Sequence, residues 1–95
     1  MWPYRIEWLE EARVDIRALD RTTVMHVFDS VLHHARTGGG DVAPLHGDLA
    51  GSFRLRVGVY RVLFTLSEGV MRIFGVRHRS EALSVNREIG LAIVS

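Results

Sequence analysis

The chain of 95 residues contains no cysteine, no lysine and only two prolines. Without cysteine it can form no disulfide, no thiol nucleophile and no cysteine-ligated zinc site. No apolar run is long enough to span a membrane, and the N-terminus lacks the basic and apolar regions of a signal peptide. These absences predict a cytoplasmic protein that does not associate with a membrane.

Signals for a cofactor or a metal ion are also missing. The run Gly38–Gly39–Gly40 lacks the preceding strand and the following Lys-Ser/Thr of a phosphate-binding loop. His33 and His34 are adjacent, so they point to different sides of a helix and make a poor pair of metal ligands. We therefore predict neither a metal site nor a cofactor.

Arginine is the chain's only basic residue apart from histidine, and it is unevenly distributed. Residues 1–50 hold five arginines and eight carboxylates, a balance of −3, whereas residues 51–95 hold seven arginines and three carboxylates, a balance of +4. An arginine-only composition fits a GC-rich genome, and it also fits bidentate recognition of phosphate. The asymmetry predicts an anion-facing C-terminal half and a solvated, acidic N-terminal half.

The N-terminal half is predicted to form one short strand and two helices. Residues 4–8 alternate as in a strand, and apolar residues then recur at helical spacing over 8–19. Asp20 is a candidate N-cap for a second helix. The apolar stripe of that helix covers 24–35, and the glycines at 38–40 end it.

The C-terminal half is predicted to form three strands after a loop at 37–51. Strand patterns cover 53–57, 59–66 and 70–76, and the short turns between them favour antiparallel pairing. Each helix has one apolar stripe, so both must cover the same face of the sheet. The expected fold is α+β, a small twisted antiparallel sheet in the order β-α-α-β-β-β with two N-terminal helices packed on one face.

Five arginines of these strands are candidates for a shared anion-binding face. Alternation places Arg54, Arg56 and Arg61 opposite the apolar residues of their strands, and Arg77 and Arg79 share a parity. A cluster requires neighbouring strands to align in register. Taken singly, Arg54 and Arg56 also fit a solvated strand face, and Arg77 and Arg79 fit a strand end that leaves the sheet.

Arg61 and His78 are the residues most suggestive of chemistry. Arg61 lies among apolar residues, so it should be partly buried and need a partner, which a structural carboxylate such as Asp48 or Glu81 could also supply. His78 stands between two arginines, whose charge favours the neutral imidazole that a general base requires. The alternative for His78 is an ordinary surface histidine.

The run from Phe53 to Val62, with the pattern R-x-R-x-G-x-Y-R-V, is followed by Arg77–His78–Arg79 and resembles the RelE/ParE superfamily of bacterial toxins. The resemblance begins within residues 6–19 and continues through residues 45–51. Each piece alone is weak, but the pieces occur in order over nearly the whole chain. The resemblance implies that residues 1–95 form one toxin domain, in which 83–95 is a tail that is helical or contacts an antitoxin.

RelE-type toxins are endoribonucleases that depend on the ribosome and cut mRNA in its A site. The resemblance implies that Arg61 and Arg77 act on the scissile phosphate. It also implies that Arg54, Arg56 and Arg79 contact phosphates of mRNA or ribosomal RNA. The expected partners are therefore a cognate antitoxin, the ribosome and mRNA.

The chain departs from the family pattern at Leu83, where many relatives have a tyrosine that serves in acid–base chemistry or stacking. Ser52 stands where some relatives have lysine. We therefore hypothesise that His78 takes the acid–base role. Two alternatives remain: a ParE-like inhibitor of DNA gyrase without nuclease activity, and a catalytically impaired relative that still binds antitoxin or RNA. Candidate antitoxin contacts are residues 89–94 and the apolar stripe of the first helix.

Overall fold

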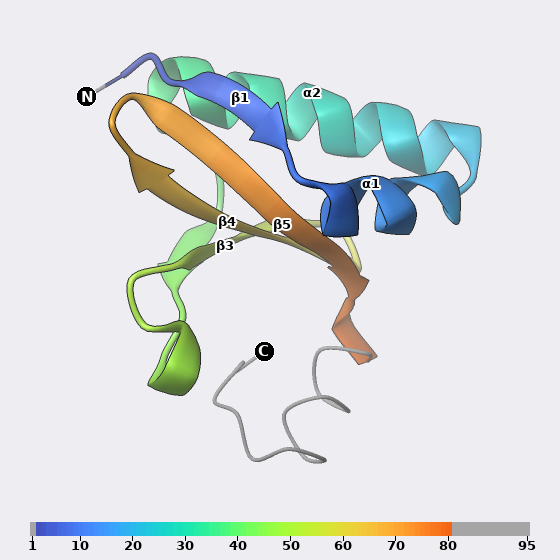
Figure 1. The fold of residues 1–95 in the computed structure, drawn as a ribbon. Helices are drawn as coiled ribbons and strands as arrows, with labels where there is room; N and C mark the ends of the chain where they lie inside the picture. The colour runs from blue at the N-terminus through green and yellow to red at the C-terminus, as the bar shows by residue number, and fades with distance from the viewer. Residues whose placement is uncertain (1, 81–95) are drawn as a thin grey trace.

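The computed structural model describes residues 2–80 as a five-stranded sheet with two helices on one side (Figure 1). The hypotheses about Glu81, Leu83 and the tail lie outside the described residues. The strands are β1 (Arg5–Trp8), β2 (Val42–Pro44), β3 (Phe53–Val57), β4 (Tyr60–Ser67) and β5 (Val70–His78). The helices are α1 (Glu10–Arg17) and α2 (Arg21–Thr37), with a short 3₁₀ turn, η1 (Gly47–Leu49), before β3.

The sheet has the order β1-β5-β4-β3-β2, and the predicted α+β class is confirmed. The sheet is mixed, however, because β1 runs parallel to β5 while every other pair is antiparallel. Turn lengths predicted the antiparallel pairs correctly. They carried no information about β1, which reaches β5 only after α1, α2 and three other strands.

The predicted loop at 37–51 is partly wrong, because it contains β2 and η1. Val42 pairs with Leu55 and Pro44 pairs with Phe53, which makes β2 the outer edge of the sheet. Three residues are too few for alternation to be recognised, and proline is tolerated at an edge where its missing N–H is not needed.

Helix α2 begins and ends close to the predicted positions. Asp20 is its N-cap, and the Thr23 hydroxyl donates a hydrogen bond to the Asp20 carboxylate. Gly38 ends the helix with φ +78°, and its N–H donates to the His34 carbonyl at 2.8 Å. A Cβ on Gly38 would also lie only 2.6 Å from Trp2 Cε2, so this position needs glycine for two independent reasons.

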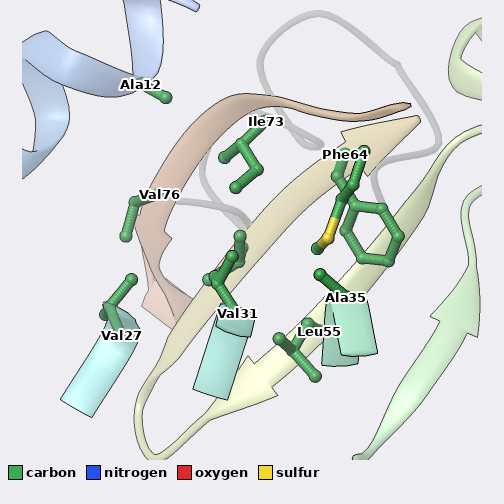
Figure 2. Close-up of a cluster of buried hydrophobic side chains, with 10 residues drawn as sticks. Ala12, Val27, Val31, Ala35, Leu55, Phe64, Ile73 and Val76 are labelled. Atoms are coloured by element: carbon green, nitrogen blue, oxygen red, sulfur yellow. The ribbon is translucent and has the colours of Figure 1, made fainter. Parts of the chain in front are cut away.

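The core lies between the helices and one face of the sheet. Figure 2 shows Val27 and Val31 of α2 among the buried side chains that face β3, β4 and β5. Phe64 and Ile73 are fully buried in the same cluster. Side chains of a strand alternate between the two faces of the sheet. Strand residues that alternate with these buried ones therefore lie on the face that α1 and α2 do not cover.

Candidate nucleic-acid interface

Three arginines form a row across β3, β4 and β5. Arg56 pairs with Arg61, and Arg61 pairs with Arg77, so the three stand at directly opposed positions on adjacent strands. Their neighbours in β4 and β5, Val62 and Val76, are buried in the core. The three arginines therefore lie on the sheet face opposite the helices, as alternation predicted. The strand register aligns them across the three strands, which the sequence alone could not establish. We call Arg56, Arg61 and Arg77 the arginine row.

Arg61 at the centre of the row is buried, and none of residues 2–80 forms an ion pair with it. Arg61 is 9% exposed, and its Nη1 donates to the carbonyls of Tyr60 at 3.3 Å and Gly58 at 3.5 Å. Its Nε is buried and finds no acceptor among the described residues. Within residues 2–80 no carboxylate forms an ion pair with Arg61, so Asp48 does not supply the predicted structural partner.

The electrostatic surroundings of Arg61 are positive. Burial, followed by the charges of Arg54, Arg56 and Arg79, lowers the pKa of Arg61 below its ordinary value. The guanidinium nevertheless stays charged in neutral solution. A buried cation among like charges is unfavourable until an anion joins it, so this site is prepared for a phosphate or carboxylate group.

The neighbouring arginines are only weakly neutralised. Arg56 Nη1 lies 3.7 Å from Asp41 Oδ2, and both side chains are more than half exposed, so this ion pair contributes little. Arg54 Nη1 is buried and has no hydrogen-bond partner within residues 2–80. Arg79 follows β5 directly and is exposed, and its backbone N–H donates to the Val59 carbonyl at 2.8 Å. Arg54 and Arg79 thus extend the positive charge on either side of Arg61.

Arg77 differs from Arg56 and Arg61 because it binds a carboxylate that belongs to a helix. Its Nε donates to Asp15 Oδ2 at 3.0 Å, and the same oxygen accepts the Val76 backbone N–H at 2.8 Å. Asp15 belongs to α1, 62 residues earlier in the chain than Arg77. Sequence reasoning gave Asp15 no role, since no local pattern reveals a contact between a helix and a strand so far apart in sequence.

His78 does not lie with the arginine row. It pairs with Tyr60 across β4 and β5, on the core side, and the two rings meet edge to face at 5.4 Å. His78 also lines a cavity of about 320 Å³ beside Asp15 and Leu19. The Ser80 backbone N–H donates to its Nδ1 at 3.1 Å, so the neutral ring carries its proton on Nε2.

Two kinds of feature, a membrane-spanning helix and a cluster of metal ligands, are absent from residues 2–80. No helix within residues 2–80 is long and apolar enough to cross a membrane. The same residues contain no group of three or more histidine, aspartate or glutamate side chains that could hold a metal ion.

Comparison with known proteins gives matches among solved structures. No family model matches the chain, and no curated protein matches it. The RelBE2 toxin–antitoxin complex from Mycobacterium tuberculosis contains a chain that is 29% identical with a TM-score of 0.73, over 81% of this chain and 99% of that one. The RelE–RelB complex from Pyrococcus horikoshii OT3 matches at 20% identity and a TM-score of 0.68, over 81% and 96%.

A third solved structure, a YoeB/ParE toxin from Agrobacterium tumefaciens, is 24% identical with a TM-score of 0.67. The match covers 78% of this chain and 97% of that one. In all three comparisons the structural match spans nearly the whole of the other chain.

Proposed function

Because the chain belongs by its fold to the RelE/ParE superfamily of toxins, we propose that it is the toxin of a type II toxin–antitoxin pair. We further assign it to the RelE-like branch, as an endoribonuclease that cleaves mRNA in the ribosomal A site. Two of the similar structures are complexes of a toxin with its antitoxin, which supports a cognate antitoxin as the first partner. Ribosome and mRNA are the proposed targets.

The reaction is attack of a ribose 2′-oxygen on the adjacent phosphorus. The new O2′–P bond forms as the P–O5′ bond breaks, which leaves a 2′,3′-cyclic phosphate and a 5′-hydroxyl group. A base must take the 2′ proton, an acid must protonate the leaving 5′-oxygen, and positive charge must stabilise the pentacovalent phosphorane. No metal or cofactor is needed if side chains provide these three functions.

The observation that carries the proposal is the buried Arg61 at the centre of the arginine row. Its guanidinium lacks a carboxylate partner within residues 2–80, and its Nε has no acceptor. A phosphate would supply both the missing charge and the missing acceptor. We assign Arg61 and Arg77 to the scissile phosphate and Arg54, Arg56 and Arg79 to neighbouring phosphates of the RNA.

His78 remains our proposed acid or base, with a constraint from its position. It belongs to the strand end that carries Arg77, but its ring lies on the core side with Tyr60. The scissile nucleotide would therefore have to reach the end of β5, where Arg77 and His78 are both partly exposed. If the RNA lies only on the arginine face, His78 cannot transfer the proton.

Primer extension on mRNA from a cell-free translation reaction tests the proposed function. We expect wild-type protein to produce cuts inside A-site codons, and Arg61→Ala to remove them. Arg36→Ala is the matched control, because Arg36 is an exposed arginine of α2 outside the arginine row. Intact mRNA with wild-type protein would refute the nuclease, and a parallel supercoiling assay would then show whether DNA gyrase is the target.

A further inference from the structure

Asp15 binds the exposed edge of β5 next to the proposed active face. β1 pairs with β5 only as far as Trp8 opposite Ile73, and the chain then turns into α1. Beyond that point the Val76 N–H has no strand partner on this side, and Asp15 Oδ2 accepts it at 2.8 Å. The same oxygen accepts Arg77 Nε at 3.0 Å. One carboxylate oxygen thus ties both the backbone and the side chain of this strand end to α1.

This contact fixes the orientation of the Arg77 guanidinium. The guanidinium is planar, so a hydrogen bond at Nε determines where its two Nη groups point. The Asp15 and Arg77 side chains are 21% and 37% exposed, so the pair is partly shielded while Arg77 stays accessible. Within residues 2–80 no second carboxylate pairs with Arg77, which leaves the Nη groups for a ligand.

Gly75 lies directly beside the Asp15–Arg77 contact. A Cβ at Gly75 would lie 3.5 Å from Arg77 Nε, 3.7 Å from Asp15 Oδ2 and 3.3 Å from Leu63 Cδ1. A Cβ at residue 75 would make ordinary van der Waals contacts with the Arg77 and Asp15 side chains, and only Leu63 would have to shift slightly. The Asp15–Arg77 contact, which joins α1 to β5, is therefore the feature that fixes the Arg77 side chain.

We propose that Asp15 is a positioning residue that aims the two Nη groups of Arg77 at the phosphate bound by Arg61. This inference rests on the proposed function, because it assumes that Arg77 acts on a phosphate. Asp15 itself touches no substrate. Its carboxylate even offsets part of the Arg77 charge, so its contribution is orientation rather than electrostatic attraction.

A double-mutant cycle on A-site cleavage tests the inference. In the wild-type background, Asp15→Ala should lower the single-turnover cleavage rate by roughly 10–100-fold, the range expected when a reacting group is misplaced by about 1 Å. Asp15→Asn keeps an acceptor oxygen and should lose less. In an Arg77→Ala background neither change at Asp15 should lower the rate further, because the group that Asp15 orients is already absent.

The cycle separates positioning from general support of the fold. If Asp15→Ala lowers the rate equally with and without Arg77, Asp15 acts through the fold and the inference is wrong. An unchanged rate for Asp15→Ala would also overturn it. Thermal melts of both Asp15 variants identify loss of folding, and Asp15→Asn is the variant to use if Asp15→Ala does not fold.

The Nε–H resonance of Arg77 tests the same contact without requiring cleavage. In ¹⁵N-labelled protein we expect a resolved signal protected from solvent exchange, which Asp15→Asn weakens and Asp15→Ala abolishes. Equal protection of the Arg77 Nε–H from solvent exchange in all three proteins would show that Asp15 does not bind Arg77. If wild-type protein leaves mRNA intact but its Nε–H signal depends on Asp15, the proposed function is wrong and the contact between Asp15 and Arg77 is still present.

Discussion

At the scale of single residues, Arg61 illustrates a conflict between stability and function. Its guanidinium is buried among like charges and has no carboxylate partner in the described part of the chain, which costs free energy in the unliganded protein. Such a residue is retained where a ligand needs it. The stability of the free protein and its activity should therefore respond to substitution of Arg61 in opposite directions.

We predict that Arg61→Met raises the free energy of unfolding by about 1 kcal/mol, the usual gain from relieving an unfavourable buried group. Methionine retains the apolar stem and removes the unpaired charge. Urea denaturation of the variant and the wild type measures the difference. A loss of more than about 1 kcal/mol would mean that Arg61 is a structural residue with stabilising contacts of its own.

His78 provides a second residue-scale prediction. If it transfers a proton in the reaction, His78→Ala should reduce the cleavage rate by roughly 10²–10⁴-fold. Single-turnover cleavage of A-site codons measures this, with Arg36→Ala as the control. An unchanged rate in His78→Ala, together with loss of cleavage in Arg61→Ala, would remove His78 from the site.

At the scale of secondary-structure elements, the two ends of α2 are secured by different means. At the N-terminal end the Thr23 hydroxyl donates to the Asp20 carboxylate, and this hydrogen bond lowers the pKa of Asp20 below its ordinary value of 3.8. The C-terminal end depends on backbone conformation and close packing, because Gly38 has a positive φ and lies against the ring of Trp2. The two ends should therefore respond differently to pH.

The contribution of Asp20 should depend on pH. Its pKa is lower in the folded protein, so its stabilising effect is complete above 3.8 and is lost as the pH falls through the folded-state value. We predict that Asp20→Ala melts at a lower temperature than wild type at pH 7 and that the two melting temperatures converge in strong acid. If the two melting temperatures differ by the same amount at all pH values, the charge of the Asp20 carboxylate does not contribute to stability.

Substitution of Gly38 should be costly at every pH. In Gly38→Ala the left-handed backbone disfavours the side chain, and the new Cβ meets Trp2 at 2.6 Å, so we predict a loss of about 1–3 kcal/mol. Gly51→Ala is the matched control, because Gly51 has φ +95° but no atom within 4 Å of the place where a Cβ would lie. Equal losses in urea denaturation would show that the contact with Trp2 contributes nothing.

At the scale of the whole molecule, alternation and turn length were enough to predict much of the architecture and one face of the site. Arg54, Arg56 and Arg61 alternate with buried residues along their strands, so their side chains could be assigned to the opposite face of the sheet. The short turns predicted the antiparallel pairs. The parallel position of β1 could not be predicted, because it depends on how two helices pack across the sheet. The three residues of β2 were too short a signal.

The candidate site was only partly visible in the sequence for similar reasons. Arg77 and His78 are adjacent in a strand, so they project to opposite faces, and grouping both with Arg61 overlooked that parity. The contact between Asp15 and Arg77 joins two elements that meet only in the folded protein. Sequence pattern thus predicts which face a residue occupies, whereas packing decides which helix reaches that face.

A stereospecific phosphorothioate substitution at the cleaved position tests whether Arg61 contacts the scissile phosphate. The measurement is the ratio of single-turnover cleavage rates for the phosphate and each phosphorothioate diastereomer on programmed ribosomes. We expect one diastereomer to slow cleavage by the wild type. Arg61→Ala, which should cleave roughly 10²–10³-fold more slowly, should largely lose this discrimination. The same discrimination in both proteins would show that Arg61 does not contact the phosphate.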